Sequence, residues 1–490
     1  MPEFIQLLTV ENTTSIRKHP RQQNLAFLLR VANLGYDKQV DIVWSGKDGV
    51  WHILPASYFA SRGDGQEYWQ ARTSLYGKAG RPLPGSIHFA VRLRCMGKEY
   101  WDNNLGENYT SLAKAGIELA KAVELQNLSF ISRLEDGQQW VKIKVALTAL
   151  FAADSVVVHW TTDNWRHSRH TSCRPGKTPK QFMTQIWTAH IKVGEAFRLQ
   201  YAICAKNSKQ QLWDNNGGLN YIASHEAFKV MILNLHCYQE DHQDRKFSQI
   251  ARAIDELGAD VVCLQEVAEH WNHGHGDWDS NSANIINKRL KQSFHLFYDW
   301  SHLGFDKYRE GVAILSRYLL LDPQSNYVSD SHDIYSIHSR KVVRARIDVP
   351  YIGSVDIFSA HLSWWEDGFQ RQFQRLCEWA DSLSAETAET RMLCGDFNIA
   401  AGSAGYRQVV DTRQYEDQYL AANAQSLFEK IFRVDDPHWQ HYLADDYRID
   451  FIFMNKDSNL SVTSARVLFT EQDYGRVSDH CGYLMTFEPK

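Results

Sequence analysis

A ten-residue string occurs twice in this chain at a fixed offset. YWDNNLGENY occupies residues 100–109 and LWDNNGGLNY occupies residues 212–221. A constant spacing between two rare strings indicates a duplicated unit, and this period is too long for a solenoid repeat but suits a small domain. We therefore expect two related modules over residues 1–112 and 113–225, followed by a third region over residues 226–490.

Both expected modules have the sequence pattern of β structure. IHFAVRLR (87–94) and FRLQYAIC (197–204) alternate apolar with polar residues and lead into the repeated string. This period of two predicts half-buried strands, and many short strands between turns predict an all-β sandwich. The Asn- and Gly-rich string itself is typical of a turn. Trp101 and Trp213 are expected to pack beneath it.

The first half of the chain resembles the family-21 carbohydrate-binding modules. The resemblance lies in VANLGYDKQVDIVW (31–44), FAVRLR (89–94) and above all YWDNNLGENY, and the second copy is looser upstream. It implies contact with starch, glycogen or a related α-glucan, because aromatic rings and amides suit sugar faces and hydroxyls. A purely structural turn remains the alternative. The candidate sugar contacts are Asn103, Asn104, Asn108 and Tyr109 in the first copy, and Asn215, Asn216, Asn220 and Tyr221 in the second.

Charge is divided unequally along the chain. Residues 226–490 hold 26 Lys and Arg against 40 Asp and Glu, or −14, whereas residues 1–225 hold 27 against 18, or +9. An acidic region is poorly suited to bind the phosphates of nucleic acid, which we exclude as a partner. No apolar run is long enough to cross a membrane and the first residues lack a signal-peptide pattern, so we expect a cytoplasmic protein without a membrane partner.

Strand and helix patterns alternate after residue 228. The buried strand FKVMILNLHCY is followed by FSQIARAIDELG, an amphipathic helix closed by Gly258, and then by the strand ADVVCLQEV. This alternation predicts an α/β domain. A carboxylate after one strand is ordinarily a cap or loop residue, but a set of reactive side chains in separate strand contexts indicates an active site. The set is Asn234, Glu266, His361, Asp396, Asn398, Asp450, Asp479 and His480.

This region resembles the endonuclease/exonuclease/phosphatase superfamily. The ordered motifs LNLHCY, LQEV, EGVAILSR, SAHL, CGDFN, RIDFIF and SDH span residues 228–490. The resemblance implies a four-layer α/β sandwich, in which two packed mixed β-sheets are flanked by helices and the active site lies at one edge. It also implies hydrolysis of a phosphate ester with Mg²⁺, or with Mn²⁺ as the alternative, for which carboxylate and amide oxygens are suitable ligands.

The same resemblance implies a role for each reactive residue. Glu266 and Asn234 would hold the cation with Asp479, and Asp396 would orient or deprotonate the attacking water. The phosphoryl group would be contacted by a second set, His361, Asn398 and His480, with Asp450 fixing the tautomer of His480. Glu310 in REGVAILSR fits the family pattern, either as a supporting residue or as an interior carboxylate.

Two loops are expected to contact the substrate. VAEHWNHGHGDW carries Trp271, His273 and His275, and HLSWWEDGF carries Trp364 and Trp365 beside His361. For the first loop the alternatives are a plain surface loop or a transition-metal site at the His-x-His pair, and for the second a core role for one tryptophan. Glucan-type modules combined with a phosphoesterase imply a small phosphorylated α-glucoside as substrate. A phosphodiesterase of the same superfamily, nuclease-like or sphingomyelinase-like, is the alternative, and a catalytically inactive glucan-binding adaptor is disfavoured because the whole reactive set is present.

Overall fold

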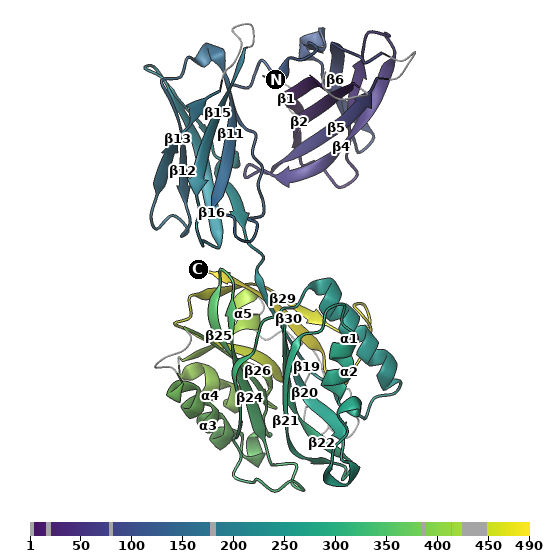
Figure 1. Cartoon of the computed structure of the whole chain (residues 1–490), viewed down its shortest axis with the longest axis vertical. Coiled ribbons are helices and arrows are strands. Elements are labelled where there is room, and N and C mark those ends of the chain that lie inside the picture. The colour runs from purple at the N-terminus through teal and green to yellow at the C-terminus, as the bar shows by residue number, and fades with distance from the viewer. Residues whose placement is uncertain are drawn as a thin grey trace. The chain divides into compact units, whose positions relative to one another are not determined.

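The computed structural model describes residues 4–15, 21–77, 82–176, 183–383, 389–412, 414–423 and 448–490. Two compact units are distinguished, Met1–His225 and Glu226–Lys490 (Figure 1). Within the described residues, no helix has both the length and the apolar composition needed to span a membrane.

The first module of the first unit is a β-sheet structure. Its strands are β1 Ile5–Ser15, β2 Gln22–Ala32, β3 Gln39–Ser45, β4 Trp51–Ser61, β5 Gln66–Tyr76, β6 Ile87–Cys95, β7 Lys98–Asp102, β8 Tyr109–Ser111 and β9 Gly116–Leu119. They follow the order β7-β6-β3-β4-β5-β2-β1-β9, with β8 paired to β6. Because β9 pairs with β1, this module continues beyond residue 112, where the sequence pattern had placed its end.

The second module is built from two sheets. Its strands are β10 Leu125–Asn127, β11 Trp140–Thr148, β12 Ser155–Thr161, β13 Arg169–Ser172, β14 Arg174–Pro175, β15 Thr184–Lys192, β16 Arg198–Lys206, β17 Gln211–Asp214 and β18 Tyr221–Ser224. One sheet has the order β10-β11-β15-β14 and the other β13-β12-β16-β17, with β18 paired to β16. Strand β11, WVKIKVALT, alternates exposed and buried residues along most of its length, and its buried face joins the core between the sheets.

The repeated string forms the same hairpin and turn in both modules. Val91 pairs with Asp102 and Ile203 with Asp214 at equivalent positions. The aspartate after each tryptophan is buried and accepts a backbone N–H from the first strand of its own module: Leu7 donates to Asp102 at 2.8 Å, and Asn127 to Asp214 at 2.6 Å. The repeated aspartate therefore ties the last hairpin of each module to its first strand.

The expected packing of the two tryptophans beneath this turn is wrong. Trp101 is 41% exposed and Trp213 is 50% exposed. Neighbouring residues in a strand point to opposite faces, so burial of the aspartate directs the preceding tryptophan outward. Arg92 lies over the ring of Trp101 with its guanidinium carbon 5.5 Å from the centroid, and His159 lies 5.0 Å from Trp213.

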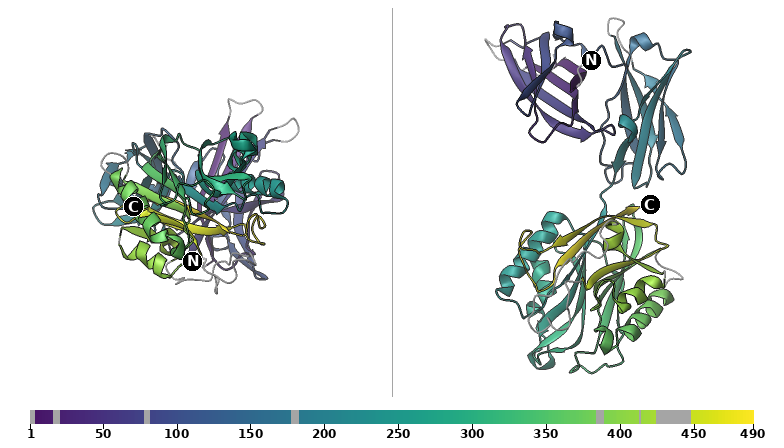
Figure 2. Two further views of the ribbon diagram at one scale, coloured as in Figure 1. Left: turned by 90° about the horizontal axis from the view of Figure 1, so that it is seen from below. Right: turned by 180° about the vertical axis from the view of Figure 1, so that it is seen from behind.

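The second unit contains two six-stranded sheets with helices on their outer faces. The first sheet has the order β21-β22-β20-β19-β30-β29, and the second has the order β23-β24-β25-β26-β28-β27. Figure 2 shows helices on both sides of the sheets. The strands are β19 Phe228–Asn234, β20 Val261–His270, β21 His295–Gly304, β22 Tyr308–Ser316, β23 Leu321–Tyr327, β24 Lys341–Val349, β25 Gly353–His361, β26 Thr390–Asp396, β27 Tyr415–Asp417, β28 Asp450–Asn455, β29 Leu460–Leu468 and β30 Gly482–Pro489.

The helices cover the two apolar outer faces. Helix α1 confirms the predicted amphipathic helix and its end, because Gly258 at φ 64 donates its N–H to Ile254 O. The buried residues of α1 and α2 belong to the core of the first sheet, and those of α3 and α4 to that of the second. The bounds are α1 Gln243–Leu257, α2 Ser282–Lys288, α3 Phe369–Ser382, α4 Ala404–Asp411 and α5 Gln418–Ala422.

Candidate active site

The ends of several strands bring the reactive residues together. Strand β26 lies between β25, to which it is parallel, and β28, to which it is antiparallel. His361 pairs with Asp396, and Asp396 pairs with Asp450, so the three residues lie side by side across these strands. Asn234, at the end of β19 in the other sheet, joins the two sheets at this point. Its Nδ2 donates to Oε1 of Glu266 at 2.9 Å and to Oδ2 of Asp396 at 3.0 Å.

Glu266 lies at an irregularity in its strand. The pairing of β20 with β22 shifts register between Leu264 and Val267, and Glu266 has φ 50, an uncommon value for a residue with a side chain. Such bulges redirect a side chain and are frequent beside active sites. Burial, and then the nearby carboxylates of Glu310 and Asp479, raise the pKa of Glu266 to about 7.

The surroundings of Glu266 fit a divalent cation. Three partly buried carboxylates that are close enough to repel one another are costly unless a positive charge lies among them. His236 Nδ1 lies 2.8 Å from Glu240 and 3.5 Å from Asp479, so a further potential ligand group adjoins the cluster. A hard cation held there would supply charge neutralisation for phosphoryl oxygens.

The expected role of Asn234 as a ligand requires a different side-chain orientation. Its amide oxygen accepts the backbone N–H of His236 at 3.0 Å, while its amide nitrogen faces the carboxylates of Glu266 and Asp396. In this orientation Asn234 bridges the two carboxylates, and only a rotation of the amide would present the oxygen to a cation.

Asp396 is placed to accept a proton. It is 1% exposed, and its Oδ1 accepts the backbone N–H of Asn398 at 2.9 Å. Burial, followed by the negative charge of Asp450, raises the pKa of Asp396 to about 7. A carboxylate whose pKa is close to neutral is a much stronger base than an ordinary aspartate, as the activation of a water molecule requires.

The two histidines of the site are held in different protonation states. Burial disfavours the charged form of His480, but the carboxylates of Asp450 and Asp479 outweigh it and hold its pKa well above the ordinary value. Burial, and then the positive charge of Arg340, hold the pKa of His361 well below the ordinary value. The site thus contains an imidazolium on one side and a neutral imidazole on the other.

Hydrogen bonds define the tautomer of His361. A guanidinium can only donate, and Arg340 Nη1 lies 3.1 Å from Nδ1 of His361, so that nitrogen is the acceptor and the proton lies on Nε2. Nε2 is 3.6 Å from Asp396, at the centre of the site. Asn398 Nδ2 lies 3.2 Å from this nitrogen, but both groups are donors in this tautomer, so the amide donates instead to Leu362 O at 2.9 Å.

Several residues of the site were not recognised in the sequence. Arg340 precedes β24 outside any motif, and His302 lies in β21, where its Nε2 is 3.2 Å from Glu310 Oε1. Burial works against the charge of Glu310, but the hydrogen bond from His302 lowers its pKa. The position of Glu310 near Glu266 makes it part of the acidic cluster.

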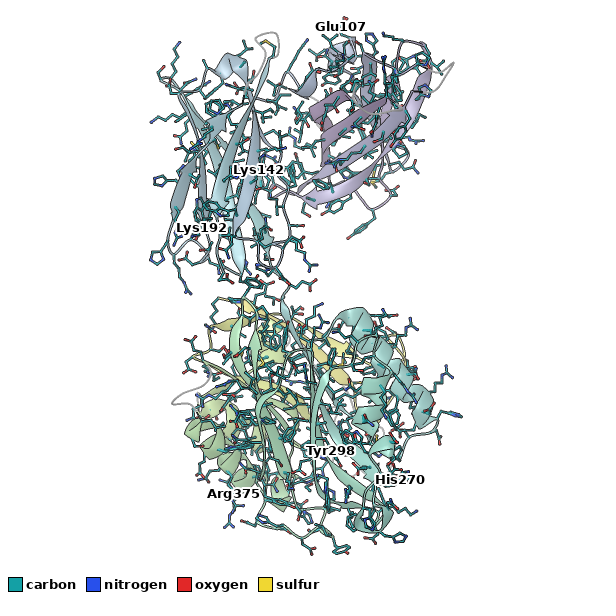
Figure 3. The ribbon with its side chains drawn as sticks, in the orientation of Figure 1. Glu107, Lys142, Lys192, His270, Tyr298 and Arg375 are labelled. Atoms are coloured by element: carbon teal, nitrogen blue, oxygen red, sulfur yellow. The ribbon has the colours of Figure 1, made fainter. Side chains whose placement is uncertain are left out.

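The two aromatic loops differ in their packing. Trp364 packs against Ile449, and Trp365, 37% exposed, lies in a short 3₁₀ turn directly after the strand that carries His361. Trp271 follows His270, labelled in Figure 3, and lies 5.8 Å from Trp300. The guanidinium carbon of Arg309 lies 5.4 Å from the centroid of Trp271 and 5.2 Å from that of Trp300, so it contacts both rings.

The His-x-His pair does not form a metal cluster in the described structure. His273 and His275 are exposed. The groups of described residues with metal-ligand spacing are His236–Glu240–Asp479 and Asp396–Asp450–His480, and neither includes the loop. Contact of this loop with a substrate stays a prediction.

The candidate sugar-contacting side chains of the two modules are used within their own turns. Asn103 and Asn215 cap the turn by accepting the N–H of Gly106 and Gly218. Two further asparagines donate across it, Asn104 to Asn108 O and Asn216 to Asn220 O. Tyr109 donates to Asp102 and Tyr221 to Asp214. In the second copy, Gly63 of the first module also donates to Asn216 O at 2.8 Å.

The α/β fold and this site together define a hydrolase of the phosphoesterase class. The sequence matches the Endonuclease/Exonuclease/phosphatase family over residues 231–480, which are 250 of the 490 residues. The chain belongs to this family. Residues 8–111 match the carbohydrate/starch-binding module of family 21.

Two curated relatives cover different parts of the chain. It is 31% identical over 125 residues to protein phosphatase 1 regulatory subunit 3E of Mus musculus, covering 26% of this chain and 44% of that protein. It is 27% identical over 182 residues to the uncharacterized protein YbhP of Escherichia coli K12, covering 35% of this chain and 67% of that protein. The chain thus spans less than half the length of the regulatory subunit.

Two solved structures are similar to the chain over 54% of its length. One is an endonuclease/exonuclease/phosphatase family protein from Leptotrichia buccalis, 25% identical, with a TM-score of 0.46. The other is the mannosyl-6-phosphatase Bt3783 of Bacteroides thetaiotaomicron, 14% identical, with a TM-score of 0.39. In both cases the match covers the whole of the other chain.

Proposed function

We propose that this protein is a cytoplasmic, Mg²⁺-dependent phosphomonoesterase acting on a small phosphorylated α-glucoside, with maltose 6′-phosphate as the most specific candidate. The observation that carries the proposal is the Asp396–Asp450–His480 arrangement beside the acidic cluster of Glu266. It combines a base for the attacking water with positive charge for the transferring group.

The chemistry divides among the residues as follows. Asp396 takes the proton of the attacking water. The imidazolium of His480 and the Nε2–H of His361 donate to phosphoryl oxygens, on which negative charge is concentrated. Glu266 and Asp479 would hold a divalent cation, which would supply positive charge to neutralise the phosphate and the leaving oxygen.

The α-glucoside part of the proposal comes from the family-21 module. A module of this family in the same chain as a phosphoesterase supports a substrate that carries both an α-linked glucose unit and a phosphate. The exposed Trp101 and Trp213, together with Trp365 beside His361, are aromatic surfaces of the kind that bind the apolar face of a pyranose.

Phosphate release across a substrate panel tests the proposal. The purified full chain with Mg²⁺ is offered maltose 6′-phosphate, glucose 6-phosphate, trehalose 6-phosphate, sphingomyelin and plasmid DNA, with Asp396→Asn as the inactive control. We expect the highest kcat/KM for maltose 6′-phosphate and no turnover by the variant. DNA nicking or sphingomyelin cleavage without phosphate release would instead establish a phosphodiesterase.

A further inference from the structure

Arg340 is a partly buried cation directed into the active site. It lies immediately before β24, where its backbone N–H donates to Ser329 Oγ at 2.8 Å. Its side chain reaches His361, with Nη1 3.1 Å from Nδ1. The carboxylates that act most strongly on its charge are those of Glu310, Glu266 and Asp396, followed by Asp367.

The hydrogen-bonding capacity of Arg340 is only partly used. Its Nε is buried and has no hydrogen-bond partner among the described residues. No carboxylate in the described part of the chain lies within ion-pairing distance of its guanidinium. Arg344 and Arg448 of this domain also have an unpartnered Nε, but their guanidinium groups form ion pairs, Arg344 with Asp322 and Asp356 and Arg448 with Asp417. A guanidinium is costly to bury without a partner, so its free donors call for an anion.

The shape of the free group indicates which anion. A guanidinium presents parallel N–H donors that match two oxygens of one phosphoryl group, and such charge-assisted pairs are stronger than neutral hydrogen bonds. The acidic cluster of Glu266, Glu310 and Asp479 occupies another part of the same site and suits a cation. A phosphate between the two would meet positive charge from the cation and from Arg340.

Building on the phosphoesterase function proposed above, we infer that Arg340 binds two non-bridging oxygens of the substrate phosphate and favours monoesters over diesters. A monoester dianion has three terminal oxygens and two negative charges, whereas a diester has two terminal oxygens and one charge. If the cation binds one terminal oxygen, a monoester still has two terminal oxygens for the guanidinium, whereas a diester has only one. The contact to His361 holds the guanidinium in place.

The test measures binding of inorganic phosphate to the full chain with Mg²⁺ by titration calorimetry, together with kcat/KM for 4-nitrophenyl phosphate and bis(4-nitrophenyl) phosphate. Arg340→Gln is expected to weaken phosphate binding by about 10- to 100-fold. It is expected to lower kcat/KM for the monoester by about 100- to 1000-fold, with a smaller loss for the diester. Arg340→Lys keeps the positive charge but lacks the parallel N–H donors of a guanidinium. Its phosphate affinity and kcat/KM should lie between those of the wild type and those of Arg340→Gln.

Two controls separate this role from a structural one. Arg371→Gln removes a positive charge from an exposed site of the same domain and should leave all values unchanged. The Mn²⁺ affinity of the Arg340 variants should be no lower than that of the wild type, because the arginine repels a cation. Their Tm should also be no lower, because Arg340 forms no ion pair with a described residue. Wild-type phosphate affinity in Arg340→Gln, or losses that parallel a fall in Mn²⁺ affinity and Tm, would overturn the assignment. Since both probes are free of sugar, inactivity on sugar phosphates alone would contradict the proposed function and not the role of Arg340.

Discussion

Asp450 and His480 form a hydrogen-bonded pair, with Oδ2 of the carboxylate 2.8 Å from Nδ1 of the ring. The other ring nitrogen lies 3.8 Å from Asp396. Asp450 therefore has two effects: together with Asp479 it raises the pKa of His480, and in addition to burial it raises the pKa of Asp396, the residue that takes the proton from water.

Replacing Asp450 tests this arrangement. Asp450→Asn removes the charge that contributes most to the raised pKa of His480, and we expect kcat to fall by about 100-fold with little change in Tm. Steady-state kinetics and thermal denaturation measure the two effects. Asp348→Asn, at an exposed carboxylate that accepts a hydrogen bond from Ser354, is the control and should behave as wild type. An Asp450→Asn enzyme with normal kcat would remove His480 from the chemistry.

The pH dependence of turnover follows from the raised pKa values of Asp396 and Glu266, both about 7. Each group functions in its ionised form. Because both pKa values are raised to about 7, the ionised carboxylate is replaced by the neutral acid as the pH falls below about 7. At saturating Mg²⁺ the cation keeps Glu266 ionised, so kcat/KM should fall about tenfold per pH unit on the acidic side. At limiting Mg²⁺ protons also compete for Glu266, and the fall should be steeper. A rate that is flat between pH 5 and 8 at both concentrations would contradict both the role of Asp396 as the base and the role of Glu266 as a carboxylate that holds the cation.

Gly395 is a tightly constrained position next to Asp396. It has φ 132, and a Cβ there would collide with the carbonyl oxygen of Ala360 and lie 2.8 Å from Nε2 of Gln265. Gly395→Ala should lower the free energy of unfolding by about 3 kcal/mol or more, because backbone strain and steric overlap add. Gly353 is the matched control, with φ 110 but no atom within 4 Å of the position of a Cβ. Gly353→Ala should cost only about 1 kcal/mol. Equal losses in urea denaturation would argue against the steric contact.

The repeated turn gives a prediction about the modules. Asp102→Ala leaves the N–H of Leu7 and the hydroxyl of Tyr109 without their acceptor. We expect the first module to lose about 2 kcal/mol or more of unfolding free energy while kcat stays unchanged. Trp101→Ala should have a small effect on stability, since this side chain is 41% exposed. Differential scanning calorimetry of the full chain compares the stabilities of the Asp102→Ala and Trp101→Ala variants. A larger loss of stability in Trp101→Ala would contradict the assignment of Asp102 as the structural residue of the turn.

Local pattern in the sequence was sufficient for some features and not for others. Glu266, Asp396 and Asp450 each adjoin an apolar run in the sequence, so their grouping near strand ends could be predicted from neighbouring residues, although Glu266 in fact lies at an irregularity within β20. The side-chain orientation of Asn234 could not, because it depends on partners from both sheets. Arg340 was missed for a similar reason: it meets His361 only through the pairing of β24 with β25, in which Val342 is opposite Ala360.

In the modules too, features that depend on contacts between distant residues could not be predicted from the local sequence. Alternation predicted their strands, but the exposure of Trp101 depends on which face of β7 carries Asp102, and that is decided by a contact with Leu7. The end of the first module was placed too early because β9 is recognisable only by its pairing with β1.

The contacts of Asp102 and Asp214 have a consequence for synthesis. They join residues 95 and 87 positions apart, so each spans nearly the whole of its module. Contacts between residues so distant in the chain form slowly, because the intervening segment must first be ordered. On the ribosome, neither module can complete its structure until its final hairpin has emerged. A nascent chain that pauses before residue 102 would therefore carry an unfinished β-sheet with an unpaired N–H at Leu7.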